Sequence, residues 1–198
     1  EQIKTESPVT HKTQAAIVMN ANPFTKGHYY LVERAAATLD HLHLFMVSDD
    51  ASAIPFAVRE RLIKENTAHF KNISYHKTQD YLISSATFPA YFLRDSDEAI
   101  ALQAALDADI FIGIAHALNI THRFVGDEPF SHVTGLYNRI LQDSLPAHGV
   151  QLHVIPRKTE NGVPISASAA RPPKRATISC SIFDLVMYIS SFFGIGMV

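Results

Sequence analysis

The sequence predicts a single α/β domain of the Rossmann-like, doubly wound kind, and two observations support this prediction. First, the 198 residues include 47% hydrophobic and 18% charged residues, which is enough for one globular core and excludes disordered or fibrous proteins. Second, short apolar runs typical of buried strands alternate with segments whose apolar residues recur at helical spacing. Such alternation predicts a parallel sheet with right-handed crossovers and helices on both faces.

The strand and helix candidates alternate from residue 14 onward. The first strand, residues 14–19, is a continuous apolar run that ends in the turn-forming sequence Asn20-Ala21-Asn22-Pro23. Further strands are expected at residues 42–47, 72–76, 121–125 and 151–155. Helices are expected at residues 27–39, 56–70, 96–118 and 132–145, the third with a break or kink around Asp107 to Asp109.

The two ends of the chain depart from this pattern. Residues 1–13 are polar, contain Pro8 and lack the apolar core of a signal peptide, so we interpret them as a linker or a cut edge. Residues 178–198 are mostly apolar and long enough to span a bilayer, but Asp184 and two glycines make a membrane anchor the less favoured interpretation. The predicted domain covers residues 14–171, followed by an atypical apolar tail at 172–198.

Charge and cysteine content exclude some classes of function. The chain has 17 basic and 19 acidic residues and a net charge of −2, so it has no overall positive charge that would attract a nucleic-acid backbone. The single cysteine, Cys180, cannot form an internal disulfide, which favours a reducing compartment such as the cytoplasm.

The loop after the first strand suggests a phosphate site. Residues 20–28 lie between a buried strand and a helix start, where unpaired N–H groups and the positive end of the helix dipole attract anions. Gly27 would let a phosphate approach the backbone, and the side chains of Thr25 and His28 can hydrogen-bond phosphoryl oxygens. A plain Asn-Pro turn with a capping threonine explains the same residues equally well.

A second segment, residues 164–171, favours the phosphate interpretation. Ser166 and Ser168 can open a helix, and the guanidinium of Arg171 can form paired hydrogen bonds with a polyphosphate. An ordinary serine N-cap is the alternative. Because the predicted topology brings both segments to the same edge of the sheet, we expect them to meet around one triphosphate.

Together the two segments resemble the paired motifs of the nucleotidyltransferase superfamily. Asn22-Pro23-Phe24-Thr25-Lys26-Gly27-His28 is similar to its histidine-glycine-histidine loop, with Thr25 at the first histidine, and Ile165-Ser166-Ala167-Ser168-Ala169-Ala170-Arg171 is similar to its serine-rich motif. Further blocks at residues 45–50, 86–93, 121–130 and 155–158 resemble one branch, the citrate lyase ligase family. Members normally carry an acetyltransferase-like domain before this part, so the chain is expected to be a fragment or a shortened form.

The resemblance implies an ATP-dependent, AMP-forming acid–thiol ligase. Acetate would attack the α-phosphorus of ATP to give acetyl-adenylate and pyrophosphate, with Mg²⁺ bridging phosphate oxygens. The phosphopantetheine-like thiol of the citrate lyase acyl carrier would then take the acetyl group. The alternatives are another nucleotidyltransferase, such as a phosphopantetheine adenylyltransferase, and a catalytically weak nucleotide-binding remnant.

The resemblance also implies residue roles. His28, Thr25 and Arg171 would act at the reacting centre, and Ser166 and Ser168 would hold the departing pyrophosphate with Arg171. The expected nucleotide-binding residues are Asn22, Phe24, Gly27, Gly126, Glu128, Ser166, Ser168 and Arg59. Gly126 and Glu128 would lie at the adenosine end, whereas a position on the helix surface explains Arg59 nearly as well. Pro172 and Pro173 would limit the second motif's helix to one turn and could displace Arg171.

Two other groups are interpreted structurally, and no metal site built by the protein is expected. His41 and His43 alternate as metal ligands can, but without a third ligand in a recognisable motif they are predicted to lie at the rim of a strand. Phe88, Tyr91 and Phe92 most simply belong to the core, although they could wall a channel for the carrier's pantetheine.

Overall fold

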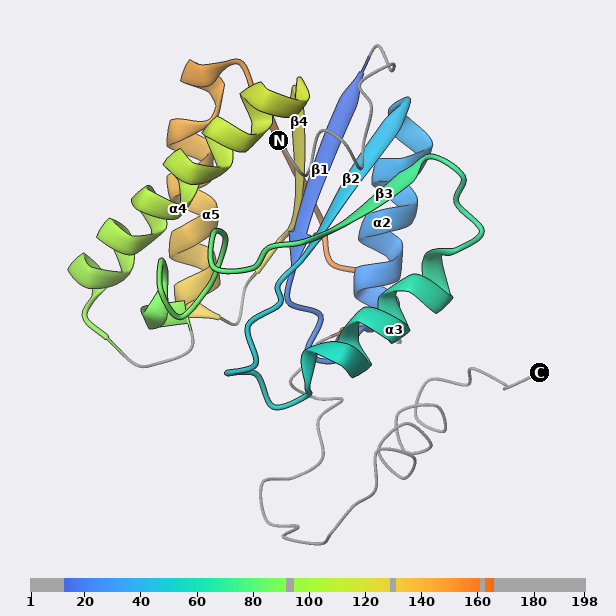
Figure 1. Cartoon of the computed structure of the whole chain (residues 1–198), viewed down its shortest axis with the longest axis horizontal. Helices are drawn as coiled ribbons and strands as arrows, with labels where there is room; N and C mark the ends of the chain where they lie inside the picture. Colours follow the sequence, from blue (N-terminus) through green and yellow to red (C-terminus); the bar gives the residue numbers. More distant parts are fainter. Residues whose placement is uncertain (1–12, 92–94, 129–130, 161–162, 166–198) are drawn as a thin grey trace, which may run out of the picture.

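The computed structural model describes residues 13–91, 95–128, 131–160 and 163–165. A parallel sheet runs through the molecule, with α2 and α3 on one face and α4 and α5 on the other (Figure 1). The strands are β1 (Gln14–Met19), β2 (His41–Met46), β3 (Ile73–Lys77), β4 (His122–Gly126) and β5 (Gln151–Ile155). The helices are α2 (Lys26–Thr38), α3 (Phe56–Thr67), α4 (Asp97–Leu118) and α5 (His132–Ser144). A short 3-10 helix, η1 (Pro89–Tyr91), precedes α4, and a second, η2 (Pro146–His148), lies between α5 and β5.

The order of the strands confirms the predicted doubly wound sheet. The five strands are arranged β3-β2-β1-β4-β5, and every adjacent pair is parallel. The chain therefore builds outward from β1 to β3, crosses back, and continues from β4 to β5. In such sheets the crevice between the two central strands, at their carboxyl ends, is where ligands bind. Here those strands are β1 and β4.

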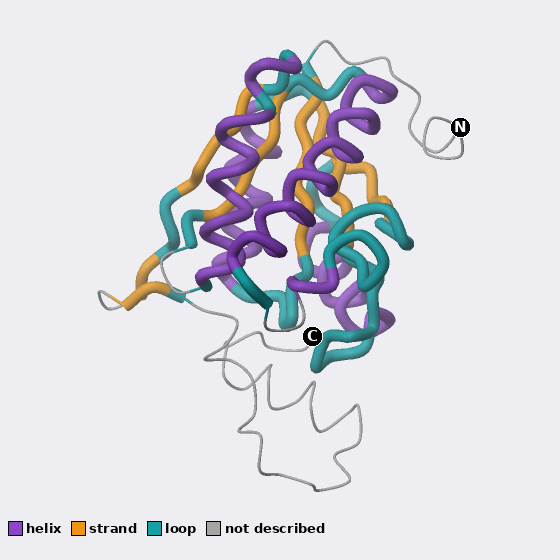
Figure 2. The backbone as a smooth tube through the Cα atoms, turned by 90° about the vertical axis from the view of Figure 1, so that its left-hand side faces the viewer, coloured by secondary structure: helices purple, strands orange, loops and turns teal. Residues whose placement is uncertain are grey.

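Two apolar cores lie on the two faces of this sheet. Figure 2, turned by 90°, shows helices lying over the strands. Successive strand residues point to opposite faces, so Ala15 and Ile17 of β1 pack toward α2 and α3, while Ala16 packs toward α4 and α5. All three side chains are fully buried. Burial on both faces explains why the central strand β1 is a nearly continuous apolar run in the sequence instead of an alternating one.

Helix α4 is continuous, so the expected break or kink around Asp107 to Asp109 is not found. The Asp107 carboxylate does not compete with the backbone of its own helix, because both of its oxygens have partners elsewhere. The amide N–H of Ile83 donates to Oδ1 at 2.6 Å, and the Tyr137 hydroxyl donates to Oδ2 at 2.6 Å. Aspartate disfavours helix interiors because its side chain competes for backbone hydrogen bonds, and here the carboxylate is occupied by partners outside the helix.

The Tyr137 hydroxyl also accepts a 3.0 Å hydrogen bond from Nη2 of Arg123, so β4, α4 and α5 share one buried polar network. Arg123 is 1% exposed and its guanidinium lies 4.0 Å from the ring centroid of Phe111. Burial raises the pKa of Asp107, and burial also raises the pKa of Tyr137, so the tyrosine remains a donor. A buried network of this kind is stable only when its members stay paired.

Among the described residues, α4 is the helix whose length and apolar composition would allow it to cross a membrane. In the fold it is instead a core helix: Ala104, Ala108 and Phe111 are fully buried in the core shared with α5. The apolar tail that raised the question of an anchor, residues 172–198, lies outside the described residues, as does Cys180.

Two details of the sheet differ from the sequence-based expectations. His41 begins β2, but His43 is not at a strand rim: it is fully buried and bonds His76 through Nδ1 at 3.0 Å and Gln14 through Nε2 at 2.6 Å. A short antiparallel pair, β6 (Thr159–Glu160) and β7 (Val163–Pro164), follows β5 and was not predicted. The sequence between its strands, Asn161-Gly162, is the dipeptide most typical of two-residue hairpins.

Candidate active site

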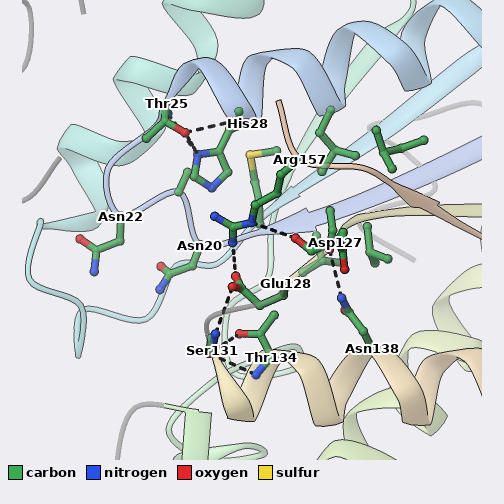
Figure 3. A pocket seen from close by; sticks show the side chains of 18 of the residues that line it. Asn20, Asn22, Thr25, His28, Asp127, Glu128, Ser131, Thr134, Asn138 and Arg157 are labelled. Carbon is green, nitrogen blue, oxygen red and sulfur yellow. Dashed lines mark hydrogen bonds and ion pairs between the residues drawn. The ribbon is translucent and has the colours of Figure 1, made fainter. Parts of the chain in front are cut away.

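A pocket of about 700 Å³ opens at the carboxyl ends of β1 and β4, where the reversal of strand order predicts a ligand. Its lining includes the loop from β1 into α2, the end of β4 with the start of α5, and the residues after β5 (Figure 3). Residues 51–53 after β2, Ile83, Tyr91 and Ile165 complete the lining. The polar residues among them include Asn20, Thr25, His28, Glu128 and Arg157.

His28 and Thr25 form a capping box at the start of α2. Thr25 is the N-cap, and its hydroxyl accepts a hydrogen bond from the backbone N–H of His28 at 3.4 Å. In return, the backbone N–H of Thr25 donates to Nδ1 of His28 at 3.1 Å, and the threonine hydroxyl lies 2.9 Å from the same nitrogen. Histidine occupies the third helical position, where glutamate or glutamine usually closes the box.

This arrangement fixes which nitrogen of His28 carries the proton. Because Nδ1 accepts from a backbone N–H, the neutral imidazole carries its hydrogen on Nε2, on the side of the ring away from Thr25. Burial lowers the pKa of His28 to about 4, and the positive charge of Arg157 adds to this shift. At neutral pH His28 is therefore an uncharged Nε2–H donor that lines the pocket.

The two predicted glycines leave room beside the backbone. A Cβ added to Gly126, at the end of β4, would meet nothing within 4 Å. A Cβ added to Gly27 would lie 3.5 Å from the Thr25 hydroxyl and 3.8 Å from the carbonyl oxygen of Ile165, which is ordinary contact. Both glycines line the pocket, and both let a ligand approach the main chain.

The residues after β5 are held to the end of β4 by Arg157. Its Nε donates to the carbonyl of Asp127 at 2.9 Å, its Nη1 donates to the carbonyl of Ile165 at 2.9 Å, and its Nη2 is ion-paired with Oε2 of Glu128. Glu128 also accepts a hydrogen bond from the backbone N–H of Ser131, the N-cap of α5, at 3.1 Å. The side chains of the Arg157–Glu128 pair are 21% and 14% exposed.

The start of the second predicted motif reaches the first. Ile165 is the last described residue and lines the same pocket as His28, with its backbone oxygen beside Gly27. The sequence separation between these residues is large, so their proximity comes from the fold. Ser166, Ser168 and Arg171 lie outside the described residues.

Comparison with known proteins agrees with this architecture. The citrate lyase ligase C-terminal domain family matches residues 14–191, nearly the whole chain. The chain belongs to this family. The match extends beyond residue 171, where we expected the domain to end.

Curated relatives of this citrate lyase ligase domain are [citrate [pro-3S]-lyase] ligases. The protein from Escherichia coli (strain K12) is 42% identical over 161 residues, which are 78% of this chain and 46% of that protein. The protein from Haemophilus influenzae is 44% identical over 162 residues, 79% of this chain and 48% of that protein. The chain thus spans about half the length of the curated relatives that it matches.

A solved structure shows the same fold at low sequence identity. Pantoate-beta-alanine ligase from Francisella tularensis, crystallised with beta-gamma ATP and beta-alanine, superposes with a TM-score of 0.53 at 12% identity. The alignment covers 87% of this chain and 70% of that one. This likeness supports the Rossmann-like fold of the citrate lyase ligase domain and nothing finer.

Two of the predicted nucleotide-binding residues support the loop that they belong to. The side-chain oxygen of Asn22 accepts a 3.1 Å hydrogen bond from the backbone N–H of Ile54, and Asn22 lines the pocket. Phe24 is 6% exposed, packs in the core beside α2 and stacks on the ring of His28 with 5.8 Å between centroids. Phe24 is not among the residues that line the pocket.

Arg59 lies neither on the helix surface nor in the pocket lining of the citrate lyase ligase domain. It is 1% exposed, and its guanidinium donates to the backbone carbonyls of four residues: Asn20, Val47, Asp49 and Ile54. These carbonyls belong to the loops after β1 and β2. Arg59 therefore holds together two loops at the carboxyl edge of the sheet, and we do not include it among the proposed phosphate ligands.

The sequence predicted no individual role for several residues that line the pocket. Arg157 belongs to a block that resembles the family, and Asn20 belongs to the turn after the first strand. On α5, Asn138 donates to the carbonyl of Gly126 at 3.1 Å, and Thr134 pairs with the N-cap Ser131. Of the aromatic block, Phe88 is fully buried in the core, Tyr91 lines the pocket, and Phe92 lies outside the described residues. Arg157 and Asn138 have partners from other elements, so no local pattern in the sequence marks them.

Proposed function

We propose that this chain is the adenylate-forming domain of a citrate lyase ligase, with ATP, acetate and the thiol of the citrate lyase acyl carrier as its substrates. The observation that supports this most is the meeting of Ile165, the first residue of the serine-rich motif, with Gly27 and His28 in one pocket. Membership of the family supports the same conclusion. Because ATP and a reduced thiol are both required, we propose a cytoplasmic location.

The proposed first half-reaction uses the pocket to position and to stabilise charge. An oxygen of acetate attacks the α-phosphorus, the bond to the β-phosphate breaks, and pyrophosphate leaves. Nε2–H of His28 would donate to a phosphoryl oxygen on which charge develops, a contribution of about 10²- to 10³-fold in rate for one such donor. The first turn of α2 presents its positive dipole end and the accessible backbone of Gly27 to the same phosphates.

The remaining ligand contacts are proposed from the family motifs. Gly126 and Glu128 would lie at the adenosine end, Asn22 and Thr25 near the phosphates, and Ser166, Ser168 and Arg171 on the pyrophosphate side. Among the described residues, no three histidine, cysteine or acidic side chains are grouped to hold a metal. We therefore propose that Mg²⁺ is held mainly by phosphate oxygens, where it would neutralise charge on the leaving group.

In the proposed second half-reaction, the carrier thiolate attacks the acyl carbon of acetyl-adenylate and AMP leaves. The test of the whole proposal is ATP–pyrophosphate exchange by this chain in the presence of acetate, followed by transfer of labelled acetate to the carrier. Exchange that requires acetate supports the proposal. Pyrophosphate release that requires phosphopantetheine instead would support an adenylyltransferase, and ATP binding without any exchange would support a nucleotide-binding remnant.

A further inference from the structure

We propose that Arg157 is a positioning residue of this active site, held in place by Glu128, which fixes the backbone of Ile165 against the first turn of α2. The inference rests on the proposed function, because it assigns a role within the same pocket. Arg157 follows β5 after one proline, and its three guanidinium nitrogens point to three separate partners. It thereby links the end of β4 to the chain that follows the hairpin β6–β7.

The contact with Ile165 has a direct consequence for the phosphate site. Ile165 is held from two sides, because its N–H donates to the carbonyl of Lys158 at 3.0 Å and its own carbonyl accepts from Nη1 of Arg157 at 2.9 Å. That same carbonyl oxygen would lie 3.8 Å from a Cβ on Gly27. Arg157 thus sets the spacing between the accessible glycine of α2 and the residue from which the serine-rich motif continues.

Glu128 is the fixed point of this arrangement. One of its oxygens accepts from the N–H of Ser131 at the start of α5, and the other is paired with Arg157. Both side chains are largely buried, so the pair is screened less than a surface ion pair. A lysine at position 157 would keep the charge but could not supply three donors in the directions of a planar guanidinium.

Arg157 also acts on His28 through its charge. After burial, the guanidinium is the second cause of the lowered pKa of the imidazole. The side chain that fixes Ile165 therefore also helps to keep His28 uncharged, as an Nε2–H donor. Geometry and charge can be separated experimentally. Arg157→Lys retains the positive charge but not the planar guanidinium, and Arg157→Gln removes both the charge and the guanidinium.

The test uses four variants: Arg157→Lys, Arg157→Gln, Glu128→Gln, and the double variant that combines Arg157→Gln with Glu128→Gln. The matched control is Arg139→Gln, which removes an exposed arginine from α5. Three measurements are made: acetate-dependent ATP–pyrophosphate exchange, the His28 pKa from imidazole NMR signals, and the thermal midpoint. We expect Arg157→Lys and Arg157→Gln to lower kcat by about 10²-fold, with a smaller change in KM for ATP, since misplacement by about 1 Å has an effect of this size.

The His28 pKa should rise in Arg157→Gln but stay low in Arg157→Lys. The double variant should have the same kcat as Arg157→Gln, because Glu128 acts on kcat through Arg157, whereas losing its proposed place at the adenosine end would change KM for ATP. Wild-type kcat in Arg157→Lys, or independent effects of the two substitutions on kcat, would overturn the proposal. The proposal would also be overturned if kcat fell only in variants whose thermal midpoint fell by more than about 4 °C. A fall of that size corresponds to roughly 1 kcal/mol in a chain of this size.

Failure of the proposed function gives a different result. If the unsubstituted chain catalyses no exchange, the amide NMR signals of Gly27 and Ile165 still report the positioning. These signals should shift in Arg157→Lys and remain unchanged in Arg139→Gln. Unshifted Gly27 and Ile165 signals in Arg157→Lys would refute the role of Arg157 regardless of what the chain catalyses.

Discussion

Replacing His28 by alanine or by glutamate separates the two roles that the structure gives this side chain, in the capping box and in the pocket. Alanine removes the acceptor of the Thr25 backbone N–H, and Thr25 is only 4% exposed. A buried donor left without a partner costs about 1–3 kcal/mol. Glutamate is the usual closing residue of a capping box, so its carboxylate can accept the same hydrogen bond.

The two variants should therefore differ in stability, whereas both should lose activity. We expect His28→Ala to lose about 1–3 kcal/mol of unfolding free energy and His28→Glu to stay within about 1 kcal/mol of the wild type. Acetate-dependent exchange should fall about 10²- to 10³-fold in His28→Ala. It should fall further in His28→Glu, because an anion then faces the phosphates in place of a neutral donor.

Urea unfolding and the exchange assay on the same samples measure both quantities, and His69→Ala, at an exposed histidine outside the pocket, is the matched control. An alanine variant as stable as the wild type would refute the capping role. A glutamate variant that retains exchange activity would refute the assignment of Nε2 as the donor to the phosphates.

Three further predictions concern pH and buried charges. Acid should destabilise the folded chain through His28. The pKa of His28 is about 4 in the folded state and 6.5 in the unfolded state, so the unfolded state binds the proton first. The contribution of His28 to the free energy of unfolding is therefore lost as pH falls from about 7 toward 4. At pH 5 this loss is up to about 2 kcal/mol, and the pH dependence of urea unfolding should be weaker in His28→Ala. Asp107→Ala should cost about 3–5 kcal/mol, because the Ile83 N–H and the Tyr137 hydroxyl lose their acceptor and buried Arg123 loses a nearby negative charge. Exposed Asp109→Ala should stay within about 0.5 kcal/mol, and equal urea midpoints would contradict this prediction. Arg59→Lys should lower the free energy of unfolding by about 2 kcal/mol or more, because loop carbonyls lose their donors, and should leave KM for ATP unchanged. Exposed Arg61→Lys is the control. A raised KM without lost stability would instead make Arg59 a phosphate ligand.

The alternation of strands and helices could be predicted because it depends on local patterns. Strands buried on both faces are apolar throughout, and the amphipathic helix candidates repeat at helical spacing. The same local reasoning gave a wrong result at Asp107, where the hydrogen bonds to Ile83 and Tyr137 come from residues 24 and 30 positions away. His43 is a similar case, since its burial depends on partners in two neighbouring strands.

The site was predictable to the extent that its residues lie next to one another in the sequence. Thr25 and His28 are three residues apart, the spacing of a capping box, and this spacing could have predicted their mutual hydrogen bonds if histidine is accepted as the closing residue. Arg157 has partners 30, 29 and 8 residues away. No local pattern specifies such a set, and only the fold identifies it.

In the resemblance to the nucleotidyltransferase loop, Thr25 takes the place of the first histidine, and the structure offers a physical reason why threonine suits this chain. As an N-cap, threonine accepts from the His28 backbone, while its own N–H selects the tautomer of the His28 ring. With only 4% of its surface exposed, Thr25 is better placed to orient His28 than to make many contacts with a ligand of its own. The imidazole of His28, which lines the pocket, is then oriented by the helix cap and by stacking on Phe24, and the nearby charge of Arg157 lowers its pKa and helps to keep it neutral. The donor of the pocket is in this way oriented before any ligand arrives, which is the condition under which one hydrogen bond contributes most to stabilising a transition state.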